Sequence, residues 1–116
     1  MTRLIAVILL LFVGSNVYGA TKDEINHLLM FVETSDCVFL RNGKEYDGAE
    51  AVEHINKKYN HFKEDINSAE KFIELSATKS TISRQPYYIQ CHGTEKTLSS
   101  TWLLLELARY RSDTNI

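Results

Sequence analysis

Apolar residues are distributed very unevenly along this chain of 116 residues. The first block is an uninterrupted apolar run from Leu4 to Val13, preceded by Arg3 and followed by a small and polar stretch that ends at Gly19. This order of a positive start, a short apolar run and small residues is that of a secretory signal peptide. The run is too short to cross a bilayer, which takes about 20 residues. We therefore expect residues 1–19 to be a signal peptide cleaved before Ala20, with no permanent membrane span afterwards.

Two later stretches, near the two ends of the remaining chain, have the apolar spacing of helices. The first is predicted over residues 22–35, with Thr21 and Glu24 forming a capping box at its start. The second is predicted over residues 102–110. Because this second helix is apolar on most sides, we expect it to be the most buried helix of the protein.

A longer helical pattern occupies residues 48–77 in the middle of the chain. Asp47, with Glu50 three residues later, forms a second capping box at its start. The pattern allows either one long helix or two helices that meet near Asn67. A further cap formed by Asn67 with Glu70 favours the break.

Between the helical stretches, short segments alternate in the manner of strands. Residues 37–41 and 44–46 surround an Asn-Gly pair, the strongest short signal for a two-residue hairpin turn. Such a turn places Phe39 opposite Tyr46. A further strand is predicted over residues 86–91. The fold class is therefore α+β, with three or four helices packed on a small antiparallel sheet made of the hairpin plus one strand.

The two cysteines of the chain, Cys37 and Cys91, both lie beyond the predicted signal peptide. An even number of cysteines in an exported chain predicts a disulfide. A bridge between them closes a loop that contributes roughly 4 kcal/mol in the chain-entropy model. A redox pair is the alternative, but the chain has no Cys-x-x-Cys motif.

Residues 20–116 are enough for one domain with one core. The whole chain has 13 Lys and Arg against 15 Asp and Glu, and Arg3 belongs to the signal peptide. The remaining chain therefore carries 12 against 15, a net charge of −3 with neutral histidines. This balance argues against nucleic acid as a partner, because phosphate binding needs a basic face.

Several short stretches, in this order and spacing, resemble the YfeK-like family of small exported bacterial proteins of unknown function. The resemblance covers about residues 21–111 and implies a periplasmic protein, but it implies no reaction. In one respect the chain departs from the family: Arg84, two residues before Pro86, stands where members often have glycine. The stretches that carry the resemblance are Cys37-x-Phe39-x-Arg41-Asn42-Gly43, Ala49-Glu50-Ala51-Val52-x-His54 with Lys58-Tyr59, Ser68-Ala69-Glu70-x-Phe72-Ile73, Pro86-Tyr87 and Trp102-Leu103.

Three residues are candidates for a partner-binding surface. Arg41 and Asn42 lie at the tip of the predicted hairpin, where a guanidinium group can meet a carboxylate or phosphate. The simpler interpretation is a turn with a solvated arginine. Tyr88 is predicted to point to the opposite side of its strand from Tyr87 and Ile89, and exposed aromatic residues are common at protein interfaces.

His54 with a neighbouring carboxylate is the one candidate for catalysis, as in a small cell-envelope hydrolase. His54 and His61 share a helix face but lie about 10 Å apart, too far to share a metal ion. Glu70 and Glu74 form a possible carboxylate pair, but Glu70 is better explained as a cap and Glu74 as a solvated residue. We therefore expect no metal and no cofactor. The sequence favours a periplasmic, non-enzymatic binding or interaction protein whose partner is an unknown protein or envelope component.

Overall fold

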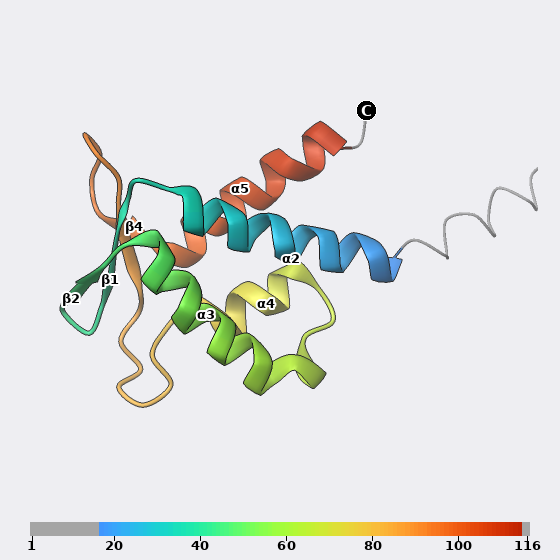
Figure 1. Cartoon of the computed structure of the whole chain (residues 1–116), viewed down its shortest axis with the longest axis horizontal. Helices are drawn as coiled ribbons and strands as arrows, with labels where there is room; N and C mark the ends of the chain where they lie inside the picture. Colours follow the sequence, from blue (N-terminus) through green and yellow to red (C-terminus); the bar gives the residue numbers. More distant parts are fainter. Residues whose placement is uncertain (1–16, 115–116) are drawn as a thin grey trace, which may run out of the picture.

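A computed structural model of the chain describes residues 17–114, so the predicted signal peptide lies almost wholly outside the described residues. Helices extend from one side of a small sheet, which lies at one end of the molecule (Figure 1). In chain order the elements are α2 (Val17–Thr34), β1 (Val38–Arg41), β2 (Lys44–Tyr46), α3 (Gly48–Phe62), a 3₁₀ turn (Lys63–Asp65), α4 (Ala69–Ser76), β3 (Tyr88–Gln90), β4 (Thr97–Leu98) and α5 (Ser99–Thr114). The predicted α+β class is confirmed.

The strands form one antiparallel sheet in the order β2-β1-β3-β4. Phe39 lies opposite Tyr46, as the two-residue turn predicts, and opposite Ile89 on its other side. The backbone of the turn residues Asn42 and Gly43 is left-handed, with φ of 52° and 78°. A type I′ turn requires this conformation at both positions. The predicted hairpin and its third strand are thus confirmed, and β4 extends the sheet by one more strand directly before α5.

The middle of the chain forms two helices rather than one, as the break near Asn67 predicted. Asp47 caps α3, and its side chain and that of Glu50 each accept a hydrogen bond from the other's backbone N–H, at 2.8 and 3.0 Å. The predicted cap of α4 was wrong by one residue. The hydroxyl of Ser68, not the side chain of Asn67, accepts the hydrogen bond from the N–H of Lys71, because Ser68 is the extended residue immediately before the helix.

Gly48 allows α3 to start directly against the end of α2. A Cβ atom at this position would collide with the backbone carbonyl oxygens of Val32 and Glu33. The close approach of these two helices therefore depends on the absence of a side chain at residue 48.

The helix α2 begins at Val17, before the predicted start, so the expected capping box of Thr21 and Glu24 is wrong. Thr21 lies inside the helix, where the backbone N–H groups bond to the preceding turn. The Glu24 carboxylate instead accepts hydrogen bonds from Arg111 of α5, at 2.7 and 3.0 Å. Glu24 therefore interacts with a residue far along the chain and not with the backbone of its own helix.

The helix α5 is longer and more exposed than predicted. Leu103 and Leu107 are buried, whereas Leu104 is 45% exposed and Leu105 is 68% exposed. The prediction that this helix is the most buried was wrong. Apolar residues lie around most of the circumference of this helix, but only one side of the helix contacts the core.

All the helices and the sheet contribute to one hydrophobic core. Phe39 and Ile89 enter it from the inner face of the sheet. The remaining buried apolar residues of this core come mainly from the helices: Ile25, Leu28, Val32, Ala51, Ile55, Ala69, Phe72, Ile73, Ala77, Leu103 and Leu107. No helix within residues 17–114 is long and apolar enough to cross a membrane.

The predicted disulfide is confirmed. Cys37 precedes β1 and Cys91 follows β3, and their Cα atoms are 4.1 Å apart. Because Val38 pairs with Gln90 in the antiparallel ladder, the next residues outward are the two cysteines. The bridge therefore closes the end of the β1–β3 pair opposite the hairpin turn.

Candidate functional site

The side chain of Arg41 lies on the inner side of the hairpin. Phe39 is buried on this side, and the alternation along β1 places Arg41 on the same side. The guanidinium carbon is 5.4 Å from the centre of the Tyr46 ring. The Tyr46 hydroxyl is the main reason why the pKa of Arg41 is raised above its usual value. The interpretation of Arg41 as a solvated arginine at the hairpin tip was wrong, because the strand register turns its side chain inward.

A cavity of about 30 Å³ adjoins Arg41. This volume accommodates about one water molecule or one small alkyl group. The hairpin, α3 and α5 all contribute to its walls. Most of the lining is apolar and comes from Phe39, Ala51, Ile55, Ala77 and Leu103, and the polar members are Arg41, Tyr46, His54, Tyr87 and Ser99.

Two buried polar atoms at this cavity have no hydrogen-bond partner among the described residues. They are Nε of Arg41 and the hydroxyl oxygen of Ser99. Ser99 is only 5% exposed. A buried polar group without a partner costs about 1–3 kcal/mol, so these two atoms are an energetic cost within the core.

His54, the candidate for catalysis, lines the same cavity from α3. The rings of His54 and Tyr46 pack edge to face, with their centres 4.9 Å apart. Burial, followed by the positive charges of Arg41 and Lys57, lowers the pKa of His54. Within residues 17–114, no carboxylate is hydrogen-bonded or ion-paired to His54. The structure places His54 beside Arg41. The charges of Glu53 and Glu50 partly offset the lowering of the His54 pKa, but neither carboxylate is hydrogen-bonded to the ring to orient it as a general base.

The other two candidates for partner binding, Asn42 and Tyr88, lie together on the outer side of the sheet. Both line a hollow of about 390 Å³. The ammonium group of Lys96 lies 4.6 Å from the centre of the Tyr88 ring. The side-chain oxygen of Asn42 accepts a hydrogen bond of 2.6 Å from the Ser83 hydroxyl. The three predicted surface residues are thus divided between the two faces of the sheet, with Arg41 on the inner face.

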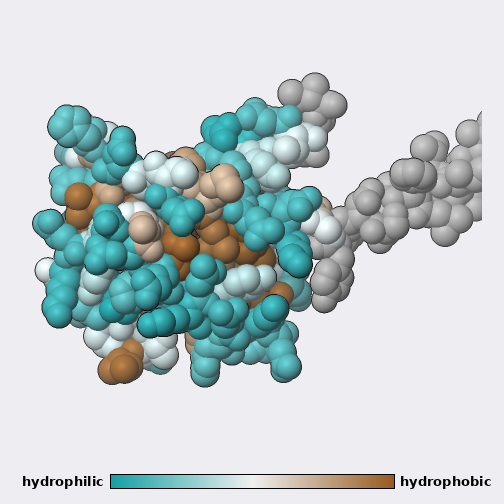
Figure 2. Space-filling model, in the orientation of Figure 1, coloured by the Kyte–Doolittle hydropathy of each residue, from teal (hydrophilic) through white to brown (hydrophobic). Residues whose placement is uncertain are grey.

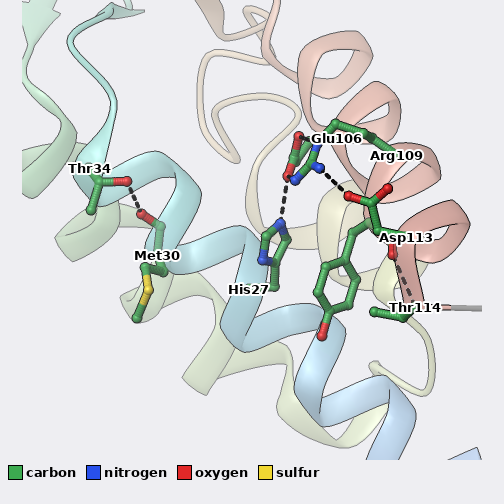
Figure 3. A network of polar contacts seen from close by, with 8 residues as sticks. His27, Met30, Thr34, Glu106, Arg109, Asp113 and Thr114 are labelled. Carbon is green, nitrogen blue, oxygen red and sulfur yellow. Dashed lines mark hydrogen bonds and ion pairs between the residues drawn. The ribbon is translucent and has the colours of Figure 1, made fainter.

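A polar network between α2 and α5 was not predicted from the sequence. Glu106 is only 6% exposed, and its carboxylate accepts hydrogen bonds from Arg109 at 2.8 and 2.6 Å. Nε2 of His27 lies 2.6 Å from the same carboxylate. Figure 3 shows the side chains of His27 and Arg109 directed at Glu106 from the two helices. Hydrogen bonding by Arg109 is the main reason why the pKa of Glu106 is lowered.

An aromatic contact between α2 and α5 accompanies this network. The ring of His27 stacks on that of Tyr110, with the centres 4.0 Å apart. Within the described residues, no serine, threonine or cysteine side chain is hydrogen-bonded to His27. The sequence contains one signal for this network: Glu106 is an acidic residue inside an apolar helix, and Arg109 follows it three residues later.

Arg111 joins three helices. Besides Glu24 of α2, its guanidinium group donates to both carboxylate oxygens of Glu70 in α4, at 2.6 and 3.0 Å. Glu70 was expected to act as a capping residue with Asn67, and this was wrong. Arg111 is the main cause of the lowered pKa of Glu70. Glu74 pairs with Lys71 at 3.2 Å, so the structure gives Glu70 and Glu74 different partners.

Neither metal binding nor paired carboxylates find support in the geometry of the described part. His61 packs against Phe62 rather than with His54. No group of three or more His, Cys, Asp or Glu side chains within residues 17–114 is arranged to hold a metal ion.

A sheet with helices on one side, tied by a single disulfide, defines a small disulfide-bonded α+β protein. The chain belongs to the DUF5329 family, a family of unknown function whose model matches residues 19–111. It is 33% identical over 84 residues to the Uncharacterized protein YfeK of Salmonella typhimurium (strain LT2). The matched region covers 72% of this chain and 70% of that protein. The resemblance to YfeK-like proteins is thus confirmed. No solved structure matches this chain.

Proposed function

We propose that this protein is exported to the periplasm, is cleaved between Gly19 and Ala20, and acts there as a non-enzymatic binding protein. Its partner is another protein or a component of the cell envelope. The partner contacts the outer face of the sheet, around Tyr88.

The position of the core supports cleavage at this point. Gly19 and Ala20 are exposed, and from residue 19 onward the first buried residue is Ile25. Removal of residues 1–19 therefore leaves the described core side chains in place. The disulfide between Cys37 and Cys91 agrees with an oxidising compartment. The mass of the protein recovered from the periplasm is expected to begin at Ala20, and recovery with Met1 retained would contradict the proposal.

The observation that carries the binding role is an apolar row across the outer face of the sheet. Leu40 of β1 pairs with Tyr88 of β3, which pairs in turn with Leu98 of β4. Paired residues point to the same face. Leu98 is 40% exposed, and Leu40 and Tyr88 are half-buried. Aromatic residues beside apolar ones are typical of the centres of protein interfaces.

Polar groups surround this apolar row, which gives a partner both contact area and orientation. Asn42, Gln85 and Lys96 line the adjoining hollow. Within the described residues Lys96 forms no ion pair, so its charge is available to a partner with a carboxylate. The hydrolase alternative, which depends on His54, has no comparable support, since His54 has no carboxylate bonded to it.

Apolar residues also reach the surface elsewhere, and they supply a control. Figure 2 shows brown in the middle of one face, where α2, α3 and α4 meet, and at the tip of the loop between α4 and β3. Ile82, in this loop, is 96% exposed. Single exposed apolar side chains are common on protein surfaces. Ile82→Ala therefore removes apolar surface without touching the proposed interface.

The test is capture of a partner from periplasmic extract by the immobilised, oxidised protein. We expect wild type and Ile82→Ala to retain the same partner. Tyr88→Ala should retain at least roughly tenfold less, the effect expected of an anchor at an interface. Equal retention by Tyr88→Ala, with folding intact by circular dichroism, would place the interface elsewhere. Turnover of ester, phosphate or peptidoglycan substrates that is lost in His54→Ala would instead support the hydrolase.

A further inference from the structure

We propose that the outer face of the sheet binds an acidic polypeptide segment, in which a carboxylate side chain stands beside an apolar residue. The carboxylate lies in the hollow next to Lys96, and the apolar residue lies against Leu40 and Tyr88. This inference rests on the proposed function, because it names the chemistry of the partner at the same surface.

The hollow on this face has room for such a segment, and its polar groups are accessible. Its volume of about 390 Å³ equals that of roughly thirteen water molecules in the liquid. Asn42, Gln85 and Lys96 in its lining are exposed, whereas Leu40 and Tyr88 are half-buried. A side chain of a partner therefore enters the hollow without displacing any part of the core.

The hollow carries an unpaired positive charge and no negative one. Among the described residues that line it, Lys96 alone is charged. None of the ion pairs within residues 17–114 includes Lys96. Its ammonium group lies 4.6 Å from the centre of the Tyr88 ring, and this cation–π contact holds the charge over the ring without neutralising it. A carboxylate is therefore the group that Lys96 is placed to bind.

Glu45 indicates on which side of the apolar row the carboxylate lies. It pairs with Leu40 in the ladder, so it lies on the outer face at the β2 edge. Repulsion by Glu45 disfavours a second carboxylate there, and attraction by Lys96 favours one in the hollow. Glu95 precedes Lys96 in the chain, but it does not line the hollow. The acidic residue of the partner is thus expected at the hollow and not at β2.

A chain of hydrogen bonds makes the Asn42 side chain a donor for a ligand. The backbone N–H of Gln85 donates to the Ser83 hydroxyl at 3.2 Å, and this hydroxyl donates to the side-chain oxygen of Asn42 at 2.6 Å. Because that oxygen is occupied, the amide nitrogen of Asn42 is the atom left for a ligand. A carboxylate, which only accepts hydrogen bonds, matches both this nitrogen and the ammonium group of Lys96.

The rest of the face favours a polypeptide over other anions of the envelope. One ammonium group suits a single carboxylate, whereas a phosphate-rich polymer needs a continuous basic face. The apolar row of Leu40, Tyr88 and Leu98 needs apolar side chains next to the carboxylate. A polypeptide supplies such side chains beside an acidic one, and a chain of acidic sugars does not.

The experiment follows backbone amide shifts of the oxidised protein, recovered from the periplasm after expression of the full-length chain. The probes are acetyl-Leu-Glu-Leu-amide, its glutamine counterpart acetyl-Leu-Gln-Leu-amide, and trigalacturonate, which is an acidic sugar chain. We expect saturable shifts at Asn42, Tyr88 and Lys96 with both peptides. The glutamate peptide should bind roughly threefold more tightly or better, within the range of an exposed ion pair.

Two results with these probes would overturn the proposal. One is equal binding of the two peptides, or the absence of saturable shifts with the glutamate peptide. The other is saturable binding of trigalacturonate together with no binding of the glutamate peptide, which would indicate an acidic polysaccharide as the partner.

Lys96→Gln removes the charge of the hollow, and Lys22→Gln is its matched control. Lys22 is exposed on α2, about 18 Å along the helix axis from Thr34, the end that leads into β1. We expect Lys96→Gln to bind the two peptides equally and Lys22→Gln to keep the preference of wild type. An undiminished preference in Lys96→Gln would exclude Lys96 as the partner of the carboxylate.

Asn42→Asp changes the charge of the hollow without changing the turn. Aspartate also adopts the left-handed conformation that residue 42 has. We expect this variant to bind the glutamate peptide roughly threefold more weakly than wild type or worse, because two carboxylates repel each other. Binding of the glutamine peptide should change by less than about twofold. Unchanged binding of the glutamate peptide would contradict the proposed position of the carboxylate.

The capture experiment distinguishes failure of this inference from failure of the proposed function. If Tyr88→Ala loses the captured partner and Lys96→Gln retains it as wild type does, the outer face is the interface but the contacting segment is not acidic. That result overturns this inference and leaves the proposed function intact. Retention of the partner by Tyr88→Ala would overturn both.

Discussion

Arg84 shows how a single residue can hold an unfavourable backbone conformation. Its φ is 62°, in the left-handed region that favours glycine. At this one position, the loop between α4 and β3 therefore has a backbone conformation suited to glycine, although the residue is an arginine. The backbone of this loop is held by hydrogen bonds from the N–H of Ser80 to Gln85 and from the N–H of Arg84 to Ser80.

We predict that Arg84→Gly is more stable than Arg84→Ala by about 1 kcal/mol, because only glycine adopts positive φ without steric cost. Both variants lose the same exposed side chain, so their difference isolates the backbone. The free energy of unfolding in urea measures it. Equal stability of the two variants would mean that the loop changes its conformation at this residue.

At the scale of elements, the contact between α2 and α5 depends on a buried charge. The Glu106 carboxylate is bonded by His27 across the helices and by Arg109 within α5. Because its pKa is lowered in the folded protein, Glu106 stabilises the fold at pH values above its ordinary pKa of 4.5. This stabilisation is lost as the pH falls through the lower folded value.

We therefore predict that Glu106→Gln lowers the free energy of unfolding by roughly 1.5–3 kcal/mol at pH 7, the range for hydrogen bonds to a charged group. The difference from wild type should shrink as the pH is lowered from about 5 to 3. Urea unfolding at several pH values measures both effects. Glu74→Gln removes the exposed partner of Lys71 and should change stability by less than about 1 kcal/mol. A difference for Glu106→Gln that does not depend on pH would show that its charge does not stabilise the contact.

At the scale of the whole molecule, the disulfide joins the two halves of the sequence. Cys37 and Cys91 are 54 positions apart, and the loop between them includes β1, β2, α3 and α4. A covalent link across so long a segment reduces the conformational freedom of the unfolded chain. For a domain of this size, the link is a considerable part of the net stability.

We predict that the double variant Cys37→Ala, Cys91→Ala loses roughly 2–4 kcal/mol of unfolding free energy. Chemical unfolding of the oxidised wild type and of the double variant measures the loss. Thiol labelling of the unfolded but unreduced wild type should find no reactive cysteine. Two reactive thiols in protein from the periplasm would contradict a structural role for the bridge.

The sequence by itself determined the features that depend on residues close together in the chain. The Asn-Gly turn set the pairing of Phe39 with Tyr46, and the capping box of Asp47 and Glu50 marked the start of α3. Helical spacing, turn conformation and capping are interactions over a few residues, so their patterns can be read directly. The even number of cysteines was enough to predict the bridge.

Only the tertiary structure decided which surfaces and charges come together. Arg41 turned out to border an inner cavity with Ser99, a residue from the other end of the chain. His27 and Glu106 are 79 positions apart, and Glu24 and Arg111 are 87 apart. Partners at such distances are selected by how the helices pack on the sheet, because the local pattern of a charged residue is the same whether it faces water or a distant helix.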